Sequence, residues 1–430
     1  MSRDFDIRIK FSIKIVFLAG LGTLLAIVLP NYYQFSSIES ISFYVKDGWC
    51  DSLTQGIGVH CFGDYYYPVK FASLSNPWGS SAFAYPPLPT FIFHIFSSVS
   101  SISGVPRFGL LLYLFTLVTV VIIPGIWMIR KANSIENFSL QFKYYFCAGL
   151  TFFSAPIIVV IDRGNNIGVL FTLVFFHFVC FKEGKRKESL ALIMLAILFK
   201  PQFILLLLLH FNRRNDLKGA FQYLSIVISS FFLLFLLYPI GIFHNIMSYL
   251  EQTSAFQLSP LPGNLFPINI SLVNVIGLLA RSLGYPITKP IIITLITATL
   301  LIFGALLFLK NFRLRSSSTN ILLITFIVIF VPAVSFHYYW IFLSIPIFFL
   351  LIEKDINTEI FNNFINRNLL FIGAGLILVP WPIPWSLIFS QSANHVFGQT
   401  GMNWLIGQLT LLLLFLKLLI VRPNQKRFKP

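Results

Sequence analysis

Asp64 is the acidic residue of this chain whose surroundings best suit a general base. It lies in CFGDYYYPVK, residues 61–70, directly before Tyr65, Tyr66 and Tyr67. Tyrosine favours the boundary between membrane and water, and a carboxylate held there among aromatic rings is partly desolvated. Desolvation raises a carboxyl pKa, so the sequence predicts that Asp64 has a raised pKa and can act as a general base. The alternative interpretation is an ordinary aspartate in an exposed loop.

Arg163 is a candidate ligand for a phosphate. It lies in SAPIIVVIDRGNNIG, residues 154–168, where an apolar run ends and the chain turns back. Gly164 permits the tight reversal, and the planar guanidinium of Arg163 matches the geometry of a phosphate. The alternative interpretation is that Asp162 and Arg163 only pair with each other and cap the turn.

Lys200 and His337 are further candidates at the ends of apolar runs. Lys200 lies in LFKPQF, between two short apolar runs, and Pro201 breaks the helix there. A buried lysine is costly without an anionic partner or a wet cavity, although its long side chain also reaches toward lipid headgroups. His337 lies in VPAVSFHYYW, where a lone histidine is either a substrate contact or a structural residue.

The four cysteines show no spacing typical of a metal site. Cys147 and Cys180 lie in apolar runs. Cys50 and Cys61 both precede the Asp64 motif, and a disulfide can form between them if this segment faces an oxidising compartment. Such a bridge would constrain the segment that presents Asp64.

The composition predicts what kind of protein must position these residues. Of the 430 residues, 57% are hydrophobic and 11% are charged, and the mean hydropathy is +0.81. Soluble domains carry about 25% charged residues, so we expect an all-α, polytopic membrane protein. The net charge of +16 suggests a nucleic acid partner, but basic loops gathered on one membrane face explain the charge equally well, and we expect no nucleic acid partner.

Long apolar runs predict about ten to twelve transmembrane helices in a single domain, residues 1–430. A short hairpin is expected around Lys200, over residues 190–211, and it need not span the membrane fully. The runs of near-spanning length are 11–29, 108–129, 144–161, 167–181, 220–238, 290–309, 321–335, 340–352, 369–389 and 404–421.

The placement of basic residues predicts the sidedness of the chain. Most of the lysines and arginines fall in alternate loops, which the positive-inside rule assigns to the cytoplasm together with both termini. This assignment requires that residues 86–103, an apolar stretch with several serines, lie on or dip into the outer face as an interfacial helix. The first outer loop then covers residues 31–107, and the remaining bundle covers 108–430.

Read in order, these stretches resemble the GT-C glycosyltransferases that use polyprenyl-phosphate sugars. GDYYYPVKFASLSNPW followed by YPPL is similar to the first outer loop of glycosyltransferase family 87 and of GPI mannosyltransferase I. SAPIIVVIDRGNN, FKPQ and PAVSFHYYW resemble, in that order, a proline-containing span end, a lysine-containing break and a late outer-face histidine. The pattern departs from the mannosyltransferases at Phe62, which replaces the first acid of Asp-x-Asp-Tyr, and at residues 76–78.

The resemblance implies an inverting glycosyltransferase of the plasma membrane, if the cell is bacterial, with its site on the outer face. Its donor would be a polyprenyl-phosphate sugar, with mannose as the expected sugar. Its acceptor would be a glycan or glycolipid. The enzyme would also contact membrane lipids, and no cofactor is expected. The resemblance implies that Asp64 is the catalytic base. Arg163, Lys200 and His337 would be the ligands of the donor phosphate. Tyr65, Tyr85 and Asn165 would contact the substrate.

Two other classes of function remain open at this point. A secondary transporter would carry ionisable residues within its spans and paired broken helices, and only the break at Lys200 and Pro201 fits that description. A non-enzymatic membrane scaffold makes no use of the order of the four motifs.

Sugar transfer is predicted to persist in excess chelator. A divalent ion needs several hard oxygen ligands, and Phe62 stands where a second carboxylate would be needed beside Asp64. A polyprenyl monophosphate sugar carries a single negative charge, which Arg163 and Lys200 can balance. Transfer measured with and without EDTA tests this. Activity that vanishes with EDTA and returns with Mg²⁺ or Mn²⁺ would show that Asp64 is a metal ligand.

Overall fold

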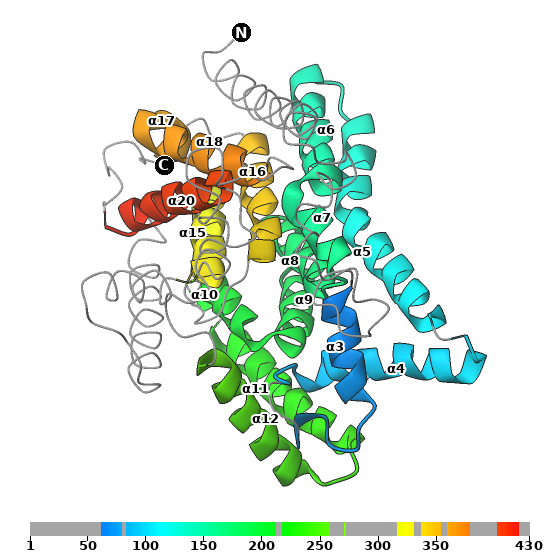
Figure 1. The fold of residues 1–430 in the computed structure, drawn as a ribbon. Helices are drawn as coiled ribbons and strands as arrows, with labels where there is room; N and C mark the ends of the chain where they lie inside the picture. The colour runs from blue at the N-terminus through cyan, green and yellow to red at the C-terminus, as the bar shows by residue number, and fades with distance from the viewer. Residues whose placement is uncertain are drawn as a thin grey trace, which may run out of the picture.

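The computed structural model describes residues 62–79, 83–105, 107–211, 217–258, 271, 316–330, 337–353, 359–378 and 402–420. Within these ranges all regular structure is helical and there is no strand, which confirms the all-α class (Figure 1). The expected spans 11–29 and 290–309 lie outside the described residues, as does the predicted Cys50–Cys61 bridge.

The described part of residues 31–107, the expected first outer loop, is largely helical. Asp64 lies in the first turn of α3 (Gly63–Ala72), which is followed by the short 3-10 helix η3 (Pro77–Gly79) and by α4 (Pro87–Ser103). Prolines suit the first turn of α4 because that turn needs no backbone N–H donor, and Gly104 ends the helix in the left-handed region, with φ 67°. The helix expected over residues 86–103 is therefore confirmed, and in Figure 1 it lies below α5 and joins the lower end of α5 at a corner.

Four helices follow: α5 (Phe108–Asn133), α6 (Phe138–Phe153), α7 (Ala155–Asp162) and α8 (Ile167–Lys182). The prediction of one continuous span over 144–161 is wrong, because the chain breaks at Ser154, whose backbone is extended with ψ 148°. Pro156 explains the break, since its ring lacks an N–H and clashes with the preceding turn. The short α7 delivers Arg163 to the turn before α8.

The predicted hairpin around Lys200 is confirmed. It consists of α9 (Arg186–Phe199), the 3-10 helix η4 (Pro201–Leu207) and α10 (Leu208–Phe211). Its two arms meet again at the base, where the hydroxyl of Ser189 lies 2.8 Å from His177 Nδ1 and 3.4 Å from His210 Nε2. Lys200 therefore lies at the opposite end, at the tip.

A sharp bend follows α11 (Leu217–Leu233) and η5 (Leu234–Leu237). The next helix, α12 (Ile242–Leu258), turns away by 107°. Trp78 of η3 is fully buried against this bend, with its ring centroid 5.0 Å from Phe235 and 4.8 Å from Tyr238. Its indole N–H donates to the carbonyl of Tyr85 at 2.9 Å. The ring contacts of Trp78 anchor the segment between α3 and α4 to the bend between η5 and α12.

The remaining described elements form a second group of helices, seen on the left of Figure 1. The Nζ of Lys182, at the end of α8, lies 3.1 Å from Glu353 Oε1, just after α16. Since Arg163 precedes α8 and Lys182 ends it, these two basic residues mark opposite ends of the bundle. The elements of this group are α15 (Ser317–Phe330), η7 (His337–Leu343), α16 (Ser344–Ile352), α17 (Glu359–Asn362), α18 (Phe364–Leu378) and α20 (Met402–Ile420).

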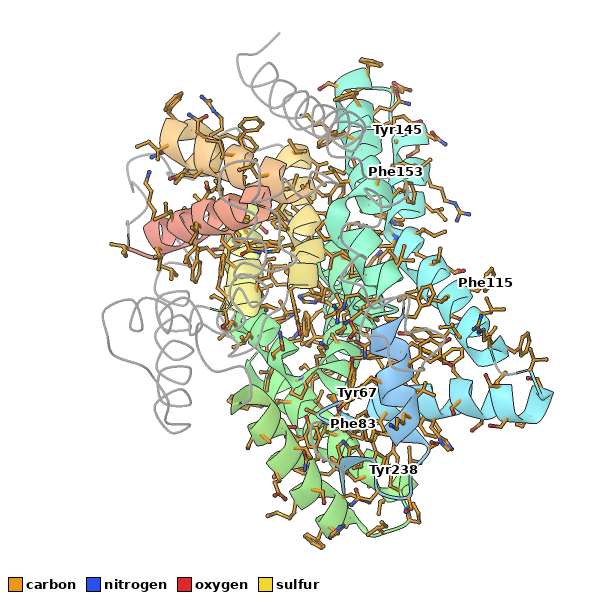
Figure 2. The ribbon with its side chains drawn as sticks, viewed as in Figure 1. Tyr67, Phe83, Phe115, Tyr145, Phe153 and Tyr238 are labelled. Atoms are coloured by element: carbon orange, nitrogen blue, oxygen red, sulfur yellow. The ribbon has the colours of Figure 1, made fainter. Side chains whose placement is uncertain are left out.

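Among the described helices, α5 alone is both long and apolar enough to cross a membrane by itself, and the bent pair α11–α12 passes the same test when taken together. Several shorter apolar helices accompany them. Apolar side chains are exposed on α5 and α6, where Phe115 is 70% and Phe153 74% exposed (Figure 2). Such surfaces fit contact with lipid. The expected number of spans stays a prediction.

Candidate active site

Asp64 is held by the turn that precedes α8. Its backbone N–H donates to the carbonyl of Arg163 at 3.0 Å. Phe62, the residue before α3, has φ 70°, and it is the one described non-glycine residue with a positive φ. Its carbonyl accepts the N–H groups of Tyr65 and Tyr66 at 2.9 and 3.0 Å. The unfavourable left-handed backbone at Phe62 is thus offset by hydrogen bonds that start α3 at Asp64.

The carboxylate of Asp64 receives three hydrogen bonds from the same turn. Arg163 donates from Nε to Oδ2 at 2.8 Å and from Nη2 to Oδ1 at 3.0 Å, and Asn165 Nδ2 donates to Oδ2 at 2.6 Å. The side chains of Asp64 and Arg163 are only 17% and 15% exposed. A bidentate, partly buried pair of this kind has a fixed geometry. The structure therefore pairs Arg163 with a residue in the first turn of α3.

The expected raised pKa of Asp64 is wrong in direction. Burial by itself raises the pKa of this carboxyl, but the charge of Arg163, the hydrogen bonds from Arg163 and Asn165, and the charge of Lys200 together hold the pKa below its ordinary value. The sequence showed the desolvation but not the cations, because they lie far away along the chain. Asp64 is therefore a stable carboxylate in this arrangement, and a weaker base than expected.

The turn between α7 and α8 depends on Gly164 and Asn165. Gly164 has φ 62°, and a Cβ there would lie 3.3 Å from the Cβ of Tyr65. Its carbonyl accepts the phenol O–H of Tyr113 at 2.9 Å. Asn165 is 2% exposed, and its Oδ1 accepts the N–H of Ile167 at 2.9 Å while its amide holds Asp64. The geometry thus makes Asn165 a support for Asp64; its predicted contact with substrate stays a prediction.

Lys200 lies close enough to Asp64 for its charge to lower the carboxyl pKa. Its backbone is extended, with φ −149° and ψ 111°, as expected for the residue before a proline. Its Nζ donates to the Oη of Tyr339 at 3.0 Å, and Tyr339 Oη donates to Gln202 Oε1 at 3.3 Å. His337 begins η7, two residues before Tyr339, but its side chain lies outside the described part of the structure.

Tyr65 and Tyr85 belong to an aromatic cluster beside the ion pair. The ring of Tyr65 lies 4.8 Å from Tyr113 and 6.1 Å from Phe93, centroid to centroid. Burial, followed by the proximity of Tyr66, raises the pKa of Tyr65 to about 12, so its hydroxyl stays protonated. The ring of Tyr85 meets Phe93 edge-on at 5.6 Å. Their predicted contact with substrate stays a prediction.

Sequence reasoning missed Tyr113 and Tyr339. Tyr339 stands in the FHYYW stretch already singled out for His337, so a signal was present. Tyr113 stands in the apolar run LLLYLF of α5, and nothing nearby in the sequence distinguishes it from a lipid-facing residue. Within the described ranges, no three His, Cys, Asp or Glu residues gather as a metal site; the chelator prediction stays open.

Comparison with known families decides the class of protein. The family model of glycosyltransferase family 87 matches residues 83–336, which is more than half of the chain. The chain belongs to glycosyltransferase family 87. This family is of the GT-C type, and its members are membrane proteins. No individual curated protein matches the chain. Membership decides against the transporter and scaffold interpretations.

The match to family 87 covers part of the candidate site. Arg163, Asn165 and Lys200 lie inside the matched residues, whereas Asp64 and His337 lie outside them. The hydrogen bonds from Arg163 and Asn165 bring Asp64 to the matched region. The tertiary contact, rather than the family match, therefore places this carboxylate beside the matched region.

Gly164→Ala is predicted to lower both thermal stability and sugar transfer. A left-handed backbone costs a residue with a Cβ about 1–2 kcal/mol, and here the added methyl group also presses on Tyr65. Gly184→Ala is the matched control, because Gly184 has φ 76° with nothing within 4 Å of its Cβ position. Both variants should lower the midpoint of thermal unfolding, but only Gly164→Ala should reduce transfer. Equal loss of transfer in both variants would contradict this role for the turn.

Proposed function

We propose that this member of family 87 is an inverting glycosyltransferase that takes a sugar, with mannose as the expected sugar, from a polyprenyl-phosphate donor. The acceptor is a glycan or glycolipid on the outer face of the membrane. One observation carries the proposal: a partly buried carboxylate, Asp64, lies beside a guanidinium and within the field of a lysine, Arg163 and Lys200. A base next to phosphate-binding cations is what such a transfer requires.

The reaction needs little more than these groups. The acceptor hydroxyl gives its proton to Asp64 as its oxygen bonds to the anomeric carbon of the donor. The bond between that carbon and the phosphate oxygen breaks on the opposite face, and polyprenyl phosphate leaves with the bonding electrons. Displacement from behind inverts the anomeric centre. Arg163 and Lys200 stabilise the negative charge on the departing phosphate.

The lowered pKa of Asp64 fits this scheme if the donor changes the partners of Arg163. Asp64 engages two of the five N–H groups of a guanidinium. A donor phosphate bound to Arg163 and Lys200 would partly neutralise their positive charge. The attraction between Arg163 and the Asp64 carboxylate would then weaken. The carboxyl pKa would then rise, because the burial that opposes its charge would remain. On this proposal, donor binding makes Asp64 a better base.

The position of the site within the bundle supports an outer-face location. Asp64, Arg163 and Lys200 share one end of the bundle, and Lys182 and Glu353 pair at the other end. The second end is also where the lysine- and arginine-rich connection of residues 182–187 lies, and loops rich in these residues stay in the cytoplasm. The site then faces outward, with both termini in the cytoplasm.

Four residues around the core of the site have proposed supporting roles. Tyr65 and Tyr85 supply hydroxyl groups and rings for substrate, and His337 contacts the phosphate or the sugar. Asn165 orients Asp64 through its amide, in addition to any contact with substrate. Residues 1–430 form one catalytic domain in this proposal, in which α4 borders a lateral opening for the polyprenyl chain.

Asp64→Asn is predicted to abolish sugar transfer. The amide keeps the shape of the carboxyl group but cannot accept the acceptor proton. Removing one partner also leaves Arg163 partly buried without its counter-ion, so a fall in thermal stability is expected as well. Transfer of labelled mannose from polyprenyl-phosphate mannose in membranes measures the activity, and Glu251→Gln, an exposed carboxyl on α12, is the control. Substantial residual transfer by Asp64→Asn would place the base elsewhere.

Arg163→Ala and Lys200→Ala are predicted to weaken binding of the lipid-phosphate donor. Each loses a charge-assisted contact with phosphate, a loss of about 1.5–3 kcal/mol in binding free energy. Direct binding of polyprenyl-phosphate mannose to the protein in nanodiscs gives the dissociation constants. The charge-preserving variant Arg163→Lys separates phosphate binding from folding, because it keeps the positive charge but loses the bidentate geometry. Unchanged donor binding with impaired folding would make Arg163 a structural residue alone.

A further inference from the structure

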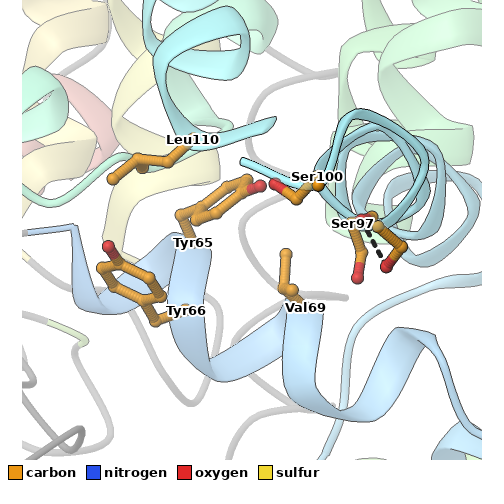
Figure 3. A pocket seen from close by; sticks show the side chains of 8 residues that line it. Tyr65, Tyr66, Val69, Ser97, Ser100 and Leu110 are labelled. Atoms are coloured by element: carbon orange, nitrogen blue, oxygen red, sulfur yellow. Dashed lines mark hydrogen bonds between the residues drawn. The ribbon is translucent and has the colours of Figure 1, made fainter. Parts of the chain in front are cut away.

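A cavity of about 380 Å³ lies between α3, the second half of α4 and the start of α5 (Figure 3). It is open to one side. Its volume falls in the lower part of the range of about 300–1,000 Å³ that small-molecule sites occupy. The residues that line it are Tyr65, Tyr66, Val69, Ser97, Ser100, Ser101, Gly104 and Leu110.

The lining combines hydroxyl groups with an apolar wall. Tyr65, Tyr66 and three serines of α4 supply hydroxyls that both donate and accept hydrogen bonds, and Val69 and Leu110 supply the apolar surface. No lysine, arginine, aspartate or glutamate is among the described residues around the cavity. A pyranose ring matches this lining, because it presents hydroxyls around its edge and C–H groups on its faces.

The close contact between α4 and α5 sets the serine-bearing wall. The N–H of Gly109 donates to Ser100 Oγ at 2.8 Å. A Cβ at Gly109 would lie 2.0 Å from the carbonyl oxygen of Phe96, so only glycine allows this approach. Ser101 Oγ donates to the carbonyl of Ser97 at 3.4 Å, the dashed line in Figure 3. The corner between the two helices is therefore closely packed, and it holds the serine side of α4 against the start of α5.

The tyrosine hydroxyls are available to a ligand as far as the described residues show. Neither Tyr65 Oη nor Tyr66 Oη forms a hydrogen bond with any described residue. Figure 3 shows the hydroxyl of Tyr65 turned toward Ser100. Both tyrosines lie in the first turns of α3, the helix that also carries Asp64.

We infer that this cavity binds a pyranose ring of the acceptor. The inference rests on the proposed function, and it adds the place and the chemical class of the acceptor. The sugar of the donor has the same ring chemistry, but the donor must also seat its phosphate on cations. The described lining offers none, whereas Arg163 and Lys200 lie on the turn before α8 and at the tip of the hairpin.

Binding of simple sugars to the full-length protein in nanodiscs tests the inference. The probes are methyl α-D-mannoside, methyl α-D-glucoside and methyl α-D-galactoside, followed by saturation-transfer NMR. At least one should bind the wild type. Ser97→Leu fills the cavity and should lower the affinity for the glycoside by about tenfold or more. Tyr66→Phe removes one hydroxyl and should lower that affinity severalfold. Ser103→Leu is the matched control, because Ser103 is an exposed serine of α4 outside the cavity and should leave binding unchanged.

Competition with lipids distinguishes the acceptor from the donor. If the cavity holds the acceptor, polyprenyl-phosphate mannose and polyprenyl phosphate should both leave glycoside binding unchanged. Displacement by the mannose-bearing lipid alone would assign the cavity to the donor sugar and overturn the inference. A lack of binding by all three glycosides would also overturn it. So would an equal loss of glycoside affinity in Ser97→Leu and Ser103→Leu. Glycoside binding as expected, without any transfer from polyprenyl-phosphate mannose, would support the sugar cavity and refute the proposed donor.

Discussion

The ion pair between Asp64 and Arg163 is the interaction on which the arrangement of the site depends. It joins residues 99 positions apart in the sequence, and a backbone hydrogen bond between the same two residues runs beside it. A partly buried ion pair stabilises a fold only when the remaining polar atoms are also satisfied. Asn165 meets this requirement by donating to the carboxylate. The same contacts start α3, shape the turn before α8 and hold α3 on the bundle.

This pairing gives the two residues competing tasks. Arg163 lowers the pKa of Asp64 and so weakens it as a base, while in the proposed reaction the same guanidinium binds the donor phosphate. Both tasks are compatible if they occur one after the other. A phosphate bound to the guanidinium reduces the degree to which Arg163 lowers the pKa of Asp64. Lys200 reaches the same site from the tip of a separate hairpin and donates to Tyr339. Three segments distant in the sequence therefore supply the charges.

The bundle keeps its two ends chemically distinct. One end gathers Asp64 with its cations and the hydroxyl-lined cavity, and the other carries the Lys182–Glu353 pair and the base of the hairpin. At that base the hydroxyl of Ser189 contacts two buried histidines, which fixes the register of the hairpin arms and hence the height of Lys200. Packing far from the site thus contributes to its geometry.

Hydrophobic runs, prolines and charge placement in the sequence determined the helical class, the helix α4 and the hairpin at Lys200, because these depend on local periodicity and on where a helix can continue. Motif order also indicated the family, which the match over residues 83–336 confirms. Only the tertiary structure decided the partner of Arg163, the lowered pKa of Asp64, and the parts played by Tyr113 and Tyr339. Each of these depends on contacts between residues dozens of positions or more apart, and a pKa follows from the charges that surround a group in space.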